Sequence, residues 1–204
     1  FIGSPGLVLG THFKGVGHGK SIVDLRSLGI DARTDGVLLV NHAKDENNFA
    51  LSQVNTNDGT WNVFLRDNAQ PTYTTYEQDP VAFVFIPKTN TALVSGRFKS
   101  DGSIDMFSGS APQFTVTNFS KGQWELRIPG HTPAGGVLII SAEGGDNQNG
   151  DNIVSYQLST NADRWVIQSR DTPANGLQTP LGANGEAESV ASFVFIPCLE
   201  AVRL

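Results

Sequence analysis

The chain has 204 residues, with 22 glycines, 10 prolines, 14 Lys and Arg and 20 Asp and Glu, and its formal net charge is −6. Because the basic residues are scattered singly, no basic stripe is present to neutralise a phosphate backbone, which argues against a nucleic-acid partner. No apolar run approaches the ~18 residues that cross a bilayer as a helix, and clean 3.6-residue periodicity is missing. The composition therefore favours an all-β protein without a membrane span.

The first half of the chain predicts a series of strands joined by polar turns. An alternating strand is expected around Leu7 and Leu9, followed by a hairpin whose loop, residues 15–20, lies at the surface. The run VLLV at 37–40 is apolar throughout, which predicts burial on both faces. Further strands are expected at 49–54, 61–66 and 81–87.

The same series returns in the second half. WNVFLRD at 61–67 recurs 104 residues later as WVIQSRD at 165–171, DGVLLV at 35–40 recurs as GGVLII at 135–140, and VAFVFIP at 81–87 recurs as ASFVFIP at 191–197. VLII in the second copy carries the same prediction of burial on both faces. VDLR aligns with WELR, which makes Val23 the counterpart of Trp124. The repetition predicts two antiparallel β-sandwich or jelly-roll-like halves, which we place at residues 1–90 and 91–204.

If the repeat is regular, the first-half counterpart of residues 88–106 would lie ahead of residue 1. They contain two strand-like segments around SDGS, in which Asp-Gly is a hairpin signal, and LEAVRL at the end resembles the start of another such segment. Three explanations are open. The chain is cut from a longer repeat array, or one hairpin serves both halves, or neighbouring molecules complete the chain ends by strand addition.

An Arg-Asp pair ends each of the two Trp strands and is the only charged dipeptide kept in both halves on the same strand. In the structural interpretation the Arg pairs across strands, the Asp caps a turn and the Trp anchors the core. In the functional interpretation the Arg contacts a sugar or a carboxylate beside the Trp, helped by the long Gly- and Pro-rich loop at 172–189. The ligand-binding candidates are Arg66, Asp67, Arg170, Asp171, Asn175 and Gln178.

Acidic and amide side chains gather in two loops at equivalent places. Calcium takes several oxygen ligands, and such loops supply them, although the spacing is not that of an EF-hand. The competing interpretation is turn chemistry, because Asn and Asp tolerate left-handed backbone and bond to their own main chain. The candidate calcium ligands are Asp146, Asn149, Asp151 and Asn152 in the second half and Asp45 and Glu46 in the first.

No catalytic residue is assigned. None of the four histidines recurs between the halves or has a metal-site spacing, and no pair of carboxylates is singled out for glycoside hydrolysis. We therefore predict that the chain is not an enzyme, while a site assembled only by folding stays open.

The run FTVTNFSKGQWELRIPG at 114–130, and W-x-x-x-x-R-D followed by FVFIP, resemble β-sandwich modules that occur in tandem in bacterial secreted and cell-surface proteins and in phage fibres. The resemblance implies adhesion, shape or substrate attachment at an extracellular, cell or virion surface. The leading hypothesis is a non-enzymatic structural or adhesive module that self-assembles through strand edges with other copies of the chain. The alternatives are a calcium-assisted carbohydrate-binding module and a portion of a secreted hydrolase, catalytic or not.

Overall fold

The computed structural model describes residues 4–44, 48–67, 76–144, 152–159, 163–171, 179–180 and 189–198. This part of the chain is built from β-strands and two short 3-10 turns, η1 (Arg26–Leu28) and η2 (Pro133–Gly135). No helix among these residues is long and apolar enough to cross a membrane. The predicted all-β class is confirmed.

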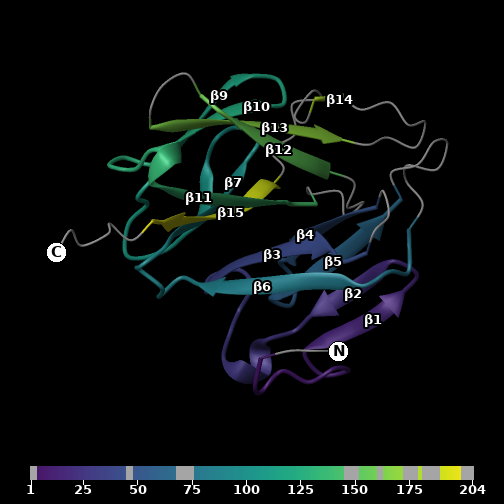
Figure 1. Ribbon diagram of the computed structural model, residues 1–204. Coiled ribbons are helices and arrows are strands. Elements are labelled where there is room, and N and C mark those ends of the chain that lie inside the picture. The colour runs from purple at the N-terminus through teal and green to yellow at the C-terminus, as the bar shows by residue number, and fades with distance from the viewer. Residues whose placement is uncertain are drawn as a thin grey trace.

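The strands before residue 90 form two antiparallel sheets. The outer sheet has the order β1-β2-β5-β4, and the inner sheet consists of β3 and β6 (Figure 1). A core of Val23, Leu38, Trp61 and Val63 lies between them. The strands are β1 (Phe13–Gly17), β2 (Lys20–Val23), β3 (Gly36–His42), β4 (Phe49–Asn55), β5 (Thr60–Arg66) and β6 (Val81–Pro87).

The strands after residue 90 form a second pair of antiparallel sheets. Their outer sheet has the order β12-β13-β10-β9, with β14 beside β13, and their inner sheet has the order β11-β15-β7-β8. The larger core of the molecule, with Trp124, Trp165 and Phe193, lies between these sheets. The strands are β7 (Val94–Lys99), β8 (Ile104–Phe107), β9 (Thr115–Ser120), β10 (Gln123–Arg127), β11 (Gly136–Ala142), β12 (Asn152–Leu158), β13 (Arg164–Asp171), β14 (Thr179–Pro180) and β15 (Ser189–Pro197).

The two halves use the same contacts at equivalent places. In the first half the rings of Trp61 and Phe85 lie 5.5 Å apart at 61°. In the second half Trp165 and Phe195 lie 5.4 Å apart, also at 61°. Both β3 and β11 begin with a glycine, because the Phe ring packs directly against that position. An added Cβ would lie 2.8 Å from the Phe85 ring at Gly36 and 2.3 Å from the Phe195 ring at Gly136. The duplication seen in the sequence thus extends to core geometry.

The strand register corrects the sequence alignment of β2 with β10. Trp61 pairs with Val23, whereas its counterpart Trp165 pairs with Leu126. Val23 therefore corresponds to Leu126, and Ser21, which pairs with Val63, corresponds to Trp124. The alignment of VDLR with WELR was wrong by two residues. A shift of two keeps every side chain on the same face, so hydrophobic alternation does not reveal it.

Two other expectations were wrong. Residues 4–12 form turns rather than an alternating strand, and Leu9 is exposed. Burial on both faces holds for β3, where Val37 and Leu39 are 0% and 4% exposed. It fails for β11, where their counterparts Val137 and Ile139 are 55% and 44% exposed. The difference depends on what covers each strand.

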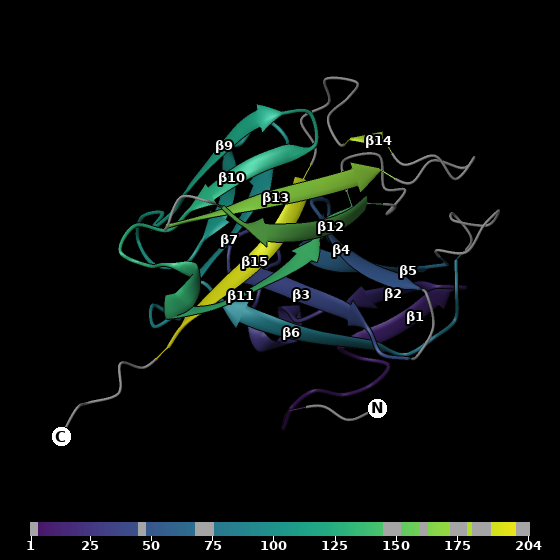
Figure 2. The same cartoon turned by 45° about the horizontal axis from the view of Figure 1, so that its top comes forward.

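The halves meet through their inner sheets, which are the middle layers in Figures 1 and 2. The strand β3 contacts β11, β15, β7 and β8, and β4 of the outer sheet contacts β11 and β12. The predicted hairpin at SDGS is β7–β8, with Gly102 at φ +86° and Ser103 N donating to Asp101 Oδ1 at 2.8 Å. This hairpin pairs with β15 and, together with β11 and β15, contacts β3 of the other half.

Candidate interaction site at the open edge of β6

The strands β6 and β15 have nearly the same sequence but different neighbours. β15 lies between β11 and β7, whereas β6 pairs with β3 alone among the described strands. No strand in the described part of the chain pairs with the second edge of β6. The first half therefore has an open sheet edge at the position that β7 closes in the second half.

The backbone groups on the open edge of β6 are identifiable. Ala43 N donates to Pro80 O at 3.0 Å and Lys88 N donates to Asp35 O at 2.7 Å. Because alternate residues of an antiparallel strand bond to the same neighbour, Ala82, Val84 and Ile86 bond to β3. The N–H and C=O groups of Val81, Phe83 and Phe85 consequently point away from β3. The equivalent groups of Phe193 and Phe195 point toward β7.

Burial differs accordingly between the two strands. Val194 is 1% exposed and its counterpart Val84 is 49% exposed. Phe193 is fully buried, whereas Phe83 is only partly buried beside the core of the first half. Since the side chains are the same, the difference in exposure comes from their surroundings, and β15 contacts both β7 and β3.

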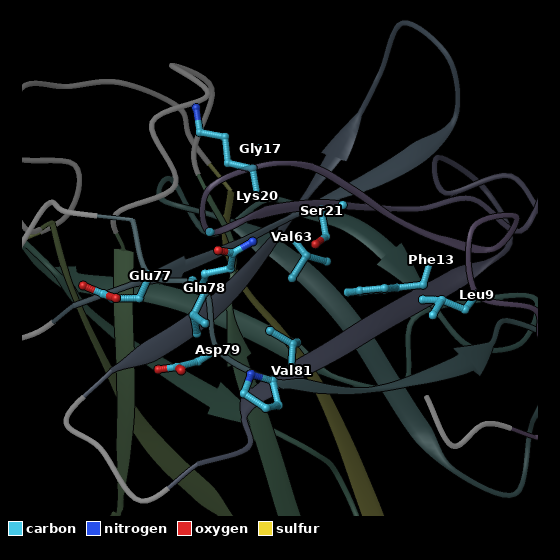
Figure 3. Close-up of a pocket in the computed structure, with 14 residues that line it drawn as sticks. Leu9, Phe13, Gly17, Lys20, Ser21, Val63, Glu77, Gln78, Asp79 and Val81 are labelled. Carbon is cyan, nitrogen blue, oxygen red and sulfur yellow. The ribbon is translucent and has the colours of Figure 1, made fainter.

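A cavity of about 310 Å³ opens beside the start of β6 (Figure 3). Phe13, Val63 and Val81 form its apolar part, Ser21 lies beside Val63, and Glu77, Gln78 and Asp79 lie at its polar end. In the second half Phe98 and Trp124 fill the corresponding space, with ring centroids 6.1 Å apart. Phe98 lies opposite Ala191, the counterpart of Val81, and Trp124 is the counterpart of Ser21. The cavity is thus the volume that a β7 strand and a larger β2 side chain would occupy.

A second apolar groove runs between the halves on the same side. Leu39, Ala82, Val84 and Ile139 line it, and its volume is about 380 Å³. Its walls come from the inner sheet of the first half and from β11 of the second half. The exposed outer face of β11 and the open edge of β6 therefore form one continuous apolar surface.

The junction between the halves also buries a carboxyl group, Glu143, which follows β11. Ser192 Oγ donates to Glu143 Oε1, and Ser52 Oγ of β4 lies 3.4 Å from the same oxygen. Glu143 Oε2 is buried and has no hydrogen-bond partner. Burial raises the pKa of Glu143 to about 7, although the positive charge of Arg97 acts to lower it. Arg97 Nε donates to Asp105 Oδ2 at 2.7 Å, so an ion pair of the β7–β8 hairpin lies near this carboxyl group.

The two Arg-Asp pairs lie in different surroundings. Arg66 is buried, donates from Nη2 to Tyr76 Oη at 2.9 Å and lies 4.2 Å from the centre of the Tyr76 ring. Arg170 is exposed, and Asp67 is partly buried. Both Trp residues are core residues, as the structural interpretation expects. The side chain of Asp171, and Asn175 and Gln178, lie outside the described residues, and a role in ligand binding stays a prediction.

Most of the calcium candidates also lie outside the described residues: Asp45, Glu46, Asp146, Asn149 and Asp151. Asn152 is described and buried, and its Nδ2 donates to the Glu143 carbonyl at 2.6 Å. Within the described ranges no three His, Cys, Asp or Glu side chains are grouped as metal ligands.

Sequence reasoning missed two features of this region. Glu143 reads as the first residue of a polar loop, and only its place directly after an apolar strand hints at burial. The cavity was hidden by the register error, because Ser21 was not recognised as the counterpart of Trp124.

No protein-family model, curated protein or solved structure matches this chain.

Proposed function

We propose that this chain is a non-enzymatic structural β-repeat module that joins to other copies of itself through the open edge of β6, at an extracellular, cell or virion surface. The observation that carries the proposal is the difference between β6 and β15. Among the described strands, β15 is paired on both edges, whereas β6, with nearly the same sequence, is paired on one.

The chemistry of β6 supports this role. Exposed edges in soluble proteins are usually blunted by charged residues, bulges or Pro within the strand. VAFVFIP carries no charge, and its Pro is the last residue. The edge adjoins the apolar groove between the halves, and unprotected edges of this kind pair with other strands. The calcium-assisted carbohydrate-binding hypothesis stays a prediction, since its residues lie mainly outside the described ranges.

Association of the chain with itself tests the proposal. We expect reversible, concentration-dependent association in sedimentation velocity. Val84→Lys should weaken it by about tenfold or more, because the substitution puts a charge on the apolar edge strand. Val16→Lys is the matched control, since Val16 is similarly exposed on β1. A chain that stays monomeric at all concentrations, or that loses association equally in both variants, contradicts the proposed function.

A further inference from the structure

We propose that the cavity beside the start of β6 binds a neutral aromatic molecule of about the size of indole. The cavity has a volume of about 310 Å³ and is lined by residues of β1, β2, β5 and β6, all in the first half. The proposal goes beyond the structural role proposed above and does not depend on it, because the ligand comes from solution and not from a second copy of the chain.

The second half shows what this position of the fold accommodates. The register of the two outer sheets makes Ser21 the counterpart of Trp124. The indole ring of Trp124 is fully buried, and its Nε1 donates to Ser100 O at 2.9 Å. A serine at the same place leaves most of the volume of that ring unfilled. The fold therefore packs an aromatic ring at this position when the chain supplies one.

The walls of the cavity suit a flat apolar ring. Phe13, Val63 and Val81 form its apolar part. Gly15 and Gly17 of β1 also line it, and a Cβ added at either glycine would meet no atom within 4 Å. The β1–β2 hairpin thus leaves this space open. A cavity of about 150 Å³ holds a benzene molecule, so about 310 Å³ admits the larger indole ring.

Two of the charged side chains that line the cavity are engaged by other residues. Lys20 Nζ lies 4.3 Å from the centre of the Tyr76 ring. Asp79 accepts hydrogen bonds from Lys44 Nζ at 3.0 Å and from Asn48 Nδ2 at 2.8 Å. A charged ligand would have to compete with these contacts, which favours a neutral one.

Uncharged polar groups complete the lining. Ser21 and Gln78 both line the cavity, and the carboxylate of Glu77 points away from Val63 (Figure 3). Small-molecule sites combine mainly apolar walls with a few polar groups that orient the ligand. A ring that carries one N–H or O–H group, as indole and phenol do, matches this lining.

Titration of the isotope-labelled full chain with indole tests the proposal by NMR, at a protein concentration below that of self-association. We expect saturable binding with a dissociation constant on the order of 0.1 mM. Intermolecular NOEs should connect indole to the methyl groups of Val63 and Val81. Phenol should bind at the same place, and cyclohexanol, which lacks the flat ring, should bind about fivefold or more weakly.

Variants that fill the cavity supply the control. Ser21→Trp gives the first half the ring that Trp124 provides in the second, so it should lower the affinity for indole about tenfold or more and raise the melting temperature. Leu158→Trp adds the same residue at an exposed position of β12 and should leave indole binding unchanged. Val81→Phe narrows the cavity from β6 and should also weaken binding, so the test does not depend on the folding of one variant.

The proposal is overturned if indole does not bind, if its NOEs lie elsewhere on the molecule, or if folded Ser21→Trp and Val81→Phe variants bind it as the wild type does. Equal binding of phenol and cyclohexanol would overturn the assignment of an aromatic ligand. The association of the chain through β6 is measured separately by sedimentation velocity, so failure of one proposal is distinguishable from failure of the other.

Discussion

Replacing Glu143 with Gln should stabilise the protein at pH 8 and leave its stability at pH 4 nearly unchanged. The Glu143 carboxyl group is completely buried at the junction of the halves, and its Oε2 has no hydrogen-bond partner. Burial raises the pKa of this group from 4.5 to about 7. An amide has a similar shape and carries no charge, so the penalty for ionisation disappears.

The direction of this pH dependence of stability follows from proton linkage. Below pH 4.5 the Glu143 carboxyl group is protonated in both the folded and the unfolded chain, and its contribution to stability is fully present. As pH rises through about 7, the unfolded chain loses this proton before the folded chain does, and that contribution is lost. A rise in pKa of this size corresponds to roughly 3 kcal/mol between the two ends of the window.

Urea unfolding of the wild type and of Glu143→Gln at several pH values between 4 and 8 measures this effect. The difference in unfolding free energy should grow with pH in favour of the Gln variant and then level off above pH 7. Using the difference removes the contributions of other carboxyl groups such as Asp31, which are common to both proteins. A difference that does not depend on pH, or one that favours Glu as pH rises, contradicts this account of the junction.

Removing the same ring from the two halves should have unequal costs. Phe195→Ala should destabilise the protein by ~3–5 kcal/mol, because the ring is fully buried against Trp165 and its loss leaves a cavity. Phe85→Ala should cost about half as much, since Phe85 has the same contact with Trp61 but is only partly buried. The difference in destabilisation would come from β7, which pairs with β15 and has no equivalent beside β6 among the described strands.

Chemical denaturation of the two variants checks this, with Val16→Ala as a control at an exposed position. If Phe85→Ala and Phe195→Ala lower the unfolding free energy equally, the edge of β6 is covered in solution as that of β15 is. That result would count against an open edge at β6.

The repeated strands could be predicted from the sequence because they carry strong local signals. Apolar alternation, the recurring Trp and the Asp-Gly turn all report on short-range structure. The register of β2 against β5 could not, since a two-residue shift preserves the face of every side chain. The Leu-Arg pair and the acidic residue before it, which VDLR and WELR share, suggested the wrong alignment. The pairing of Trp61 with Val23, which corrects it, is seen only in the folded sheet.

The candidate site depends on long-range neighbours, which sequence patterns do not report. The run at Val137 and Ile139 has the same apolar character as that at Val37 and Leu39, yet only the second pair is buried, on a strand that contacts β7, β8 and β15. Glu143 is buried because β4 and β15 meet beside it, and both are distant in sequence. The strands are present in both halves, but among the described strands the β7–β8 hairpin pairs with β15 and no equivalent hairpin pairs with β6.

Hydrogen exchange at single amides tests the open edge most directly. Phe83 and Phe85 lie in AFVFIP, and Phe193 and Phe195 lie in SFVFIP, so their intrinsic exchange rates are nearly the same. We expect the amides of Phe83 and Phe85 to exchange about 100-fold or more faster than those of Phe193 and Phe195 in the monomeric chain. Equal protection of the two pairs would mean that β6 is already paired on both edges, and would contradict the central claim.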